Sequence, residues 1–455
     1  MIRPLLRSLL AGAALLALAG PAAAETVAIV NARIETASAA GVIPSGTIVL
    51  KDGRIAAVGA SVPVPAGARV IDARGGVVTP GFVFPSTNLS ASEIGGVRST
   101  RDDGSGKLSA GFDISYSVNP ASAMIPLARQ TGVTTAVVTP TLGGGGGGHA
   151  HDDSGDGHDD FAGGGGGGEG DPNLFAGQAA VITLAAGRSD IVLKSRVAVA
   201  LDLGEDGARN AGGSRGAQLV LIRSALEDAR SFARNRAAYD RGGTRDFGLS
   251  RVDLEALVPV VEGRTPLLIR VHRASDIRQA LRLARELQIR IIIEGAEEGW
   301  LVAEDLAAAQ VPVIVDSQAD LPAQFETLGA RLDNAARLQR AGVQVAIMGS
   351  RDFNNLRQAR LNAGLAVAYG LNRDAAMASI TSVPAKIWGL TGTGSLESGK
   401  EADVVLWNGD PLETSSWPLA VFIDGVEQPQ SSRAFELRDR YAQPGPNGYP
   451  QAYRY

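Results

Sequence analysis

Cysteine is absent from the 455-residue chain, and histidine occurs only four times. Without cysteine the chain can form no disulfide, no thiolate zinc site and no cysteine nucleophile. Basic residues are not in excess either, because 43 Lys and Arg stand against 48 Asp and Glu and the net charge is −5. This balance argues against the positively charged surface that nucleic-acid binding requires, so we expect no nucleic-acid partner.

Long apolar runs are missing after residue 24, so we expect no segment of the mature chain to cross a membrane. Residues 1–24 have the pattern of a signal peptide. Arg3 and Arg7 supply the positive start, an apolar stretch runs from Leu9 to Leu18, and small alanines precede the cleavage point. The alternative, a membrane anchor, needs about 20 apolar residues, which is longer than this stretch. The sequence therefore predicts a periplasmic or secreted protein without membrane attachment after cleavage.

Glycine is abundant, with 57 residues, and it is concentrated in residues 143–170. Two runs of six glycines enclose three of the four histidines, which are interleaved with aspartates. Such a segment cannot bury enough apolar surface to order itself, so we predict a flexible insert. Two interpretations remain open, a solvated insert and a binder of a divalent metal such as zinc. The candidate ligands are His149, His151, His158 and Asp152.

Short strands separated by turns are predicted from Glu25 to Gly81, and Asp52-Gly53 joins two of them in a pair typical of tight hairpins. From Val78 onward, apolar strands alternate with helical stretches such as Ser275–Leu287. This alternation indicates an α/β fold with a parallel sheet, either a barrel or a doubly wound sheet. Strands return near the C-terminus, and the stretch from Pro429 is expected to be an irregular tail.

Both ends of the mature chain carry motifs of one family. Residues 45–84 contain SGTIVLKDGRIAAVGA and GGVVTPGF, and residues 377–425 contain SVPAKIWGL and GSLESGKEADVVLW. These motifs resemble the opening and closing signatures of the amidohydrolase superfamily, most closely its secreted imidazolonepropionase-like branch. The resemblance implies an α/β fold, with a distorted TIM-like (β/α) barrel over residues 81–387 and a small β-sandwich from residues 25–80 and 388–428. A C-terminal tail over residues 429–455 completes the expected organisation.

The same resemblance implies a hydrolase of C–N bonds in non-peptide or dipeptide-like amides, with divalent metal held by histidines at strand ends. In this chain the expected His-x-His pair aligns with Ser86 and Asn88, and the aspartate before it with Phe84. The histidines after the fifth and sixth strands align with Arg270 and Gly295. Serine and asparagine oxygens are weak neutral ligands and arginine adds a positive charge, so we predict no metal at the barrel site.

Two candidates for catalysis remain. His272 matches the second histidine after the fifth strand, and it is either a residual base or a structural residue bonded to Asp276. Asp352 lies two residues after Ser350, which stands where the family has an aspartate. Asp352 is either the proton-transfer group or the N-cap of a helix beginning near Asn354.

Two other charged residues are candidates for binding. Arg215, in the text GGSRGAQ, is a candidate for binding an anionic group of the substrate. Lys194 is interpreted as an ordinary surface lysine in preference to a carbamylated lysine bridging two metals.

Three functions remain open from the sequence. The first is hydrolysis of a small-molecule substrate by an altered site. The second is a non-catalytic barrel that acts as a binding or partner module, for example beside a homologous amidohydrolase subunit. The third is metal binding by the Gly-rich insert.

Overall fold

The computed structural model describes residues 25–94, 97–141, 173–319, 322, 324–349 and 358–442. Several features singled out in the sequence lie outside these residues. They are the predicted signal peptide, the last part of the tail, Ser350, Asp352 and the insert with His149, His151, Asp152 and His158.

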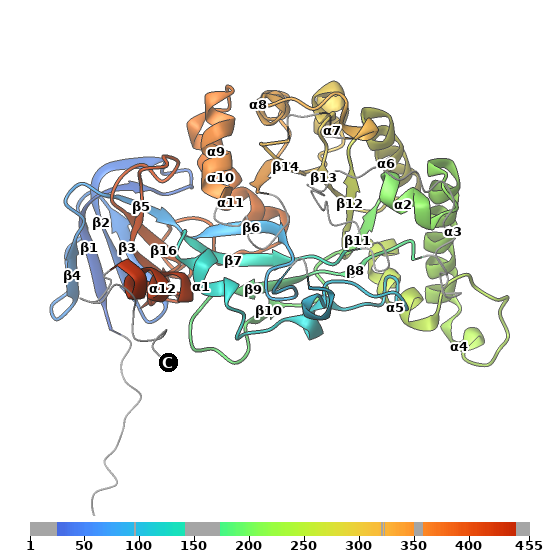
Figure 1. Cartoon of the computed structure of the whole chain (residues 1–455), viewed down its shortest axis with the longest axis horizontal. Coiled ribbons are helices and arrows are strands. Elements are labelled where there is room, and N and C mark those ends of the chain that lie inside the picture. The colour runs from blue at the N-terminus through green and yellow to red at the C-terminus, as the bar shows by residue number, and fades with distance from the viewer. Residues whose placement is uncertain are drawn as a thin grey trace, which may run out of the picture.

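Strands from both ends of the chain form one eight-stranded sheet, on the left of Figure 1. Its order is β18-β17-β16-β5-β1-β2-β3, and β4 pairs with β1. The sheet encloses its own apolar core, which includes Ile29, Leu50 and Phe422. Its strands are β1 (Val27–Glu35), β2 (Val42–Lys51), β3 (Arg54–Gly59), β4 (Arg69–Asp72), β5 (Val77–Pro80), β16 (Val404–Trp407), β17 (Pro418–Ile423) and β18 (Val426–Glu427).

The predicted hairpin at Asp52-Gly53 is confirmed, because Lys51 of β2 pairs with Arg54 of β3. Asp52 and Gly53 have φ angles of 50° and 74°. Two positive φ angles at the centre of a two-residue turn match the twist of the flanking strands.

The barrel consists of two sheets with strand orders β10-β9-β7-β6 and β15-β14-β13-β12-β11-β8, and β15 lies against β6. Strands β11 to β15 are parallel in sequence order, as are β6 and β7. These strands are β6 (Phe82–Thr87), β7 (Val133–Val138), β8 (Gly177–Gln178), β9 (Ala180–Thr183), β10 (Val192–Lys194), β11 (Val199–Asp202), β12 (Leu267–Val271), β13 (Ile291–Gly295), β14 (Val313–Asp316) and β15 (Val345–Met348).

The expected distorted (β/α) barrel is therefore present, but its strands are not all parallel. Strand β9 runs antiparallel to β7, and β8 runs antiparallel to β11. The described residues between β7 and β11 contain no helix, so the crossover that would make these strands parallel is absent there.

Helices cover the outside of the barrel, with α6 to α9 along the top of Figure 1 and α3 at its right. Helix α6 confirms the predicted amphipathic helix, because Ile277, Ala280 and Ala284 are buried on one face. The helices are α1 (Met124–Arg129), α2 (Glu205–Asn210), α3 (Arg215–Arg234), α4 (Arg236–Tyr239), α5 (Arg251–Val261), α6 (Ala274–Leu287), α7 (Ala303–Ala308), α8 (Asn334–Arg340), α9 (Ala359–Ala368), α10 (Arg373–Ser379), α11 (Ser382–Ile387) and α12 (Arg433–Ala442).

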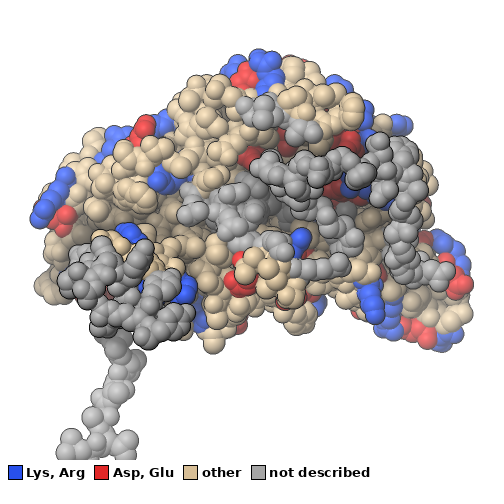
Figure 2. Space-filling view, in the orientation of Figure 1, with Lys and Arg blue, Asp and Glu red and all other residues tan. Residues whose placement is uncertain are grey.

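The expectation of an irregular tail from Pro429 is wrong for its first part, because α12 lies there. This helix buries none of its residues, so it lacks the strong apolar periodicity by which a helix is recognised in a sequence. Within the described ranges, no helix combines the length and apolarity needed to span a bilayer. On the described part of the face in Figure 2, Lys and Arg are mixed with Asp and Glu along the edges.

Trp407 joins the terminal sheet to the barrel. Its indole Nε1 donates to Thr79 Oγ1 at 3.0 Å, and its ring stacks on Phe82 with 5.3 Å between centroids. Gly132, just before β7, approaches this ring so closely that an added Cβ would lie 2.7 Å from it. The ring of Trp407 therefore contacts the start of both β6 and β7 and holds them against the terminal sheet.

Gly132→Ala should destabilise the protein more than Gly342→Ala. Both glycines have a positive φ, 88° and 91°, but no atom lies within 4 Å of a Cβ built at Gly342. Backbone strain alone should cost about 1 kcal/mol at Gly342, whereas the clash with Trp407 should add about 1–3 kcal/mol at Gly132. Urea unfolding of the two variants measures the difference, and equal losses would contradict the role assigned to Trp407.

Candidate active site

Ionisable residues occupy the carboxyl ends of three adjacent barrel strands. Asp202 of β11 is in register with Arg270 of β12, and Arg270 is in register with Glu294 of β13. Residues in register on neighbouring parallel strands point to the same side of the sheet. The three side chains therefore form a row at one end of the barrel, which we call the mouth.

Arg270 and Glu294 form a buried ion pair in this row. Nε of Arg270 donates to Oε1 of Glu294 at 2.7 Å, and the two residues are 8% and 1% exposed. Nη2 of Arg270 also donates to the carbonyl of Pro140 at 2.9 Å and to Thr139 Oγ1 at 3.4 Å, both just beyond the end of β7. The Arg270 guanidinium thus spans from the six-stranded sheet to the four-stranded sheet.

The two positions aligned with the His-x-His pair have different surroundings. The hydroxyls of Ser86 and Thr139 lie 2.8 Å apart, so Ser86 joins the contacts around Arg270. Asn88 donates from Nδ2 to Asp103 Oδ2 at 3.1 Å, in the segment that follows β6. The two side chains do not share a partner in these bonds. Phe84 is buried in the barrel core.

Gly295, which the resemblance aligns with a strand-end histidine, is the last residue of β13. Glu294 is the residue beside Arg270, while Gly295 pairs with Val271. Gly295 has a φ of 94°, and an added Cβ would lie 2.9 Å from Nδ1 of His272. A larger residue would be strained at Gly295 and would collide with the imidazole ring.

His272 belongs to a second cluster at the mouth. Nδ1 lies 2.5 Å from Glu297 Oε2, and Nε2 lies 3.7 Å from Glu326 Oε1. Burial lowers the pKa of His272, but the hydrogen bond to Glu297 and the charges of Glu297, Glu326 and Asp202 outweigh it and raise the pKa to about 9. His272 therefore carries a positive charge at neutral pH.

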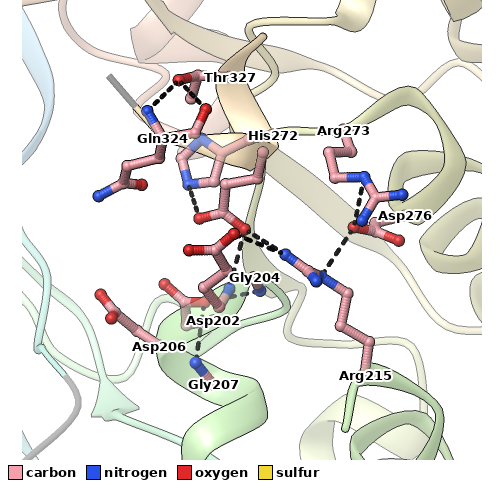
Figure 3. A network of polar contacts seen from close by, with 12 residues as sticks. Asp202, Gly204, Asp206, Gly207, Arg215, His272, Arg273, Asp276, Gln324 and Thr327 are labelled. Atoms are coloured by element: carbon pink, nitrogen blue, oxygen red, sulfur yellow. Dashed lines mark hydrogen bonds and ion pairs between the residues drawn. The ribbon is translucent and has the colours of Figure 1, made fainter. Parts of the chain in front are cut away.

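The expectation that His272 bonds to Asp276 is wrong. Oδ2 of Asp276 lies 3.2 Å from Nε of Arg215 and 3.9 Å from Nε of Arg273 instead (Figure 3). Asp276 lies on α6, and its side chain faces the start of α3, whereas His272 faces the segments after β13 and β14.

Arg215 lies in the same cluster, as the first residue of α3. Its guanidinium lies 3.0 Å from Glu326, 3.2 Å from Asp276 and 3.4 Å from Glu205, and 29% of its side chain is exposed. Three carboxylates already surround this cation, so a substrate anion at Arg215 would compete with them. Lys194 lies elsewhere, exposed, and donates from Nζ to the carbonyl of Gly389 at 2.6 Å.

Two half-buried aspartates complete the mouth. Oδ1 of Asp202 accepts from the backbone N–H of Gly204 at 2.8 Å, and burial raises the pKa of Asp202 above its usual range. Asp316, at the end of β14, accepts from Gln318 N and Asn362 Nδ2 at 3.0 Å each. Burial, together with repulsion by Glu297, raises the pKa of Asp316 as well.

Sequence reasoning missed five carboxylates of this site. Three of them lie at or next to the carboxyl ends of barrel strands, namely Asp202, Glu294 and Asp316. A carboxylate at the end of an apolar run is a signal for such a site that can be recognised in a sequence. Glu297 follows β13 within two residues. Glu326 lies in a short 3₁₀ turn, Phe325–Thr327, and no motif marks it.

Comparisons with known proteins show which family the chain resembles. The family model "Amidohydrolase family" matches residues 276–428. An amidohydrolase from Thermotoga maritima MSB8 superimposes with a TM-score of 0.74 at 25% identity, covering 88% of this chain and 99% of that one. The match of residues 276–428 and the shared fold relate the chain to the amidohydrolase superfamily.

Two other proteins are also similar to this chain. Amidohydrolase tasK of Hapsidospora irregularis is 24% identical over 396 residues, which are 79% of this chain and 37% of that protein. This chain therefore spans little more than a third of that relative. Molinate hydrolase shares the fold, with a TM-score of 0.52, 18% identity and coverage of 95% of this chain and 99% of that one. The chain thus shares its fold with a hydrolase.

The described residues of the mouth do not fit the divalent metal of the superfamily. At the positions that the sequence resemblance aligns with metal-binding imidazoles, the chain has the hydroxyl of Ser86, the amide of Asn88 and the cation of Arg270. Among the residues with described positions, no group of three or more His, Asp or Glu has an arrangement that could hold a metal ion. A fixed guanidinium repels a dication, and neutral oxygens do not replace imidazoles.

Arg270→Ala should lower the free energy of unfolding by about 3–5 kcal/mol, because it leaves the Glu294 carboxylate buried without its cation. The double variant Arg270→Met/Glu294→Leu should recover most of this loss, since both charges are then removed. Arg264→Ala, which breaks an exposed pair with Glu262, is the matched control and should cost well under 1 kcal/mol. Denaturant unfolding gives all three values, and a loss for Arg270→Ala no larger than the control would contradict the pairing.

His272→Gln should change stability in a pH-dependent way. Because the folded-state pKa of His272 is raised from 6.5 to about 9, its charge stabilises the fold fully below pH 6.5 and ceases to do so as pH rises to about 9. The difference in unfolding free energy between wild type and variant should fall by up to about 3 kcal/mol across this interval. A difference that stays constant from pH 6 to about pH 10 would show that folding does not raise the pKa of His272.

Proposed function

We propose that the chain is an exported amidohydrolase-superfamily barrel that binds a small molecule at its mouth without a resident metal. On this proposal it does not hydrolyse C–N bonds by the metal-activated route of the superfamily. The observation that carries the proposal is the buried Arg270–Glu294 pair at the ends of β12 and β13. Its cation lies among the strand ends where the superfamily holds its metal.

The energetics support this assignment. Removing one partner of a buried ion pair costs about 3–5 kcal/mol, so a metal that drew Glu294 away from Arg270 would have to overcome that loss. The new ligands would be one carboxylate with the neutral oxygens of Ser86 and Asn88, a weak set for zinc or nickel. The mouth keeps polar groups that can still recognise a ligand, since His272 and Arg215 are 23% and 29% exposed.

Elemental analysis of the purified mature protein, beside a variant lacking residues 143–170, tests the proposal. We expect the deleted variant to hold far less than one equivalent of zinc, nickel or manganese, and added zinc not to raise its melting temperature. One equivalent bound by both proteins would overturn the proposal. Metal bound only by the full chain would leave the mouth metal-free and assign metal binding to the insert with His149, His151, Asp152 and His158.

A second candidate is metal-independent hydrolysis of an amide. It is favoured by the charged imidazole of His272, which could donate a proton to a leaving nitrogen. A panel of cyclic amides and dipeptides, assayed with a chelator present, tests it. Turnover that survives chelation and is lost in His272→Gln would support this candidate, and absence of turnover would leave the binding proposal.

An intact scaffold without a metal site also fits a role beside a homologous amidohydrolase subunit. Purification of the tagged chain from its native extract, followed by mass spectrometry of the associated proteins, tests this role. Recovery of a related amidohydrolase in a fixed ratio would support it, and recovery of the chain alone would count against it.

A further inference from the structure

A groove of about 910 Å³ lies at the end of the barrel opposite the mouth. Pro266, Pro312 and Gln344 line it, and each comes just before the start of a barrel strand. The second half of α6 and the end of α7 form its walls. The groove is thus separate from the site described above.

The groove has an apolar floor and a cationic rim. Leu281, Ala284, Ile289, Ile291, Val311 and Ile387 contribute apolar surface. Five cations line it, and Asp305 is its one acidic lining residue. The cations are Arg278, Arg282, Arg285, Arg290 and Lys386, and all five are exposed. We call this feature the arginine groove.

Part of this positive charge is not neutralised by the protein. Arg278 lies 3.3 Å from Asp305, and Arg282 pairs with Glu286. Within the described residues, Arg285 and Lys386 form no ion pair, and Arg290 donates only to a backbone carbonyl at 3.5 Å. Since the whole chain has a net charge of −5, the excess of cations here is a local feature.

The cations form a row and do not converge on one point. Arg278, Arg282 and Arg285 are spaced i, i+4 and i+7 on α6, so they lie on one face of the helix. At about 1.5 Å per residue they span roughly 10 Å along the helix axis. A single phosphate or carboxylate would meet only one or two of them. An extended peptide, with about 3.3 Å per residue, can place several carboxylates along this row and apolar side chains on the floor.

We propose that the arginine groove binds an acidic, amphipathic peptide segment of a partner protein. Charge complementarity holds the carboxylates at the rim, and the apolar floor takes the side chains between them. The groove is then a docking surface that leaves the mouth open to its own ligand.

The test uses the full mature chain and a fluorescein-labelled peptide of about twelve residues in which Glu alternates with Leu and Ser. Fluorescence anisotropy should give a dissociation constant in the micromolar range, weaker at high salt. Arg285→Glu/Lys386→Glu should weaken binding at least about tenfold. Arg241→Glu/Arg440→Glu makes the same charge change at exposed arginines outside the groove, and it should change binding less than about twofold.

Arg285→Gln/Lys386→Gln, which removes charge without reversing it, covers the case in which the first variant unfolds. It should show an intermediate loss, with an unchanged melting temperature. Absence of peptide binding by the wild type, or an equal loss in the control variant, would overturn the proposal. Binding to phosphatidylglycerol vesicles in place of the peptide, lost in the same groove variants, would also overturn it and assign the groove to a lipid surface.

Discussion

The guanidinium of Arg270 is buried between the two sheets of the barrel, and the arrangement of the mouth depends on it. Two charges taken out of water are stable only if geometry is good and the remaining hydrogen-bonding groups are satisfied. Arg270 meets this condition by binding Glu294 on the next strand and the carbonyl of Pro140 on the other sheet. Strand β9 runs antiparallel to β7, and the two barrel sheets are not joined there by a parallel strand pair. The bond from Arg270 to Pro140 therefore links the two sheets where backbone hydrogen bonds between strands do not.

The two ends of the barrel differ in how far their cations are paired with carboxylates. At the mouth, carboxylates from several strand ends surround His272 and Arg215. At the other end, arginines of α6 line a groove with few acidic neighbours. The strands run from the arginine groove to the mouth, so the ligands of the two sites would meet opposite ends of one barrel. Binding at one end therefore does not obstruct the other.

Regular elements of the fold could be predicted because their signals are local. Asp52-Gly53 marks a hairpin by its turn chemistry, and α6 shows a clear apolar face. The pairing of Arg270 with Glu294 could not be predicted, because it depends on the register between β12 and β13, and no local pattern reports that register. Glu326 could not be predicted, since only tertiary folding brings its turn to His272.

In the proposed metal-free mouth, ion pairs balance the charge of the carboxylates at the strand ends. In a metal site, a dication offsets the repulsion between carboxylates that converge at the strand ends. Here side chains do so, with Arg270 beside Glu294, and Arg215 and protonated His272 beside Glu326. A dication entering this mouth would add charge where the cations already present compensate the acids, and it would have to displace one of them. If the proposed metal-free mouth is correct, the ion pairs of Arg270, Arg215 and His272 neutralise the carboxylates that a dication neutralises in a metal site.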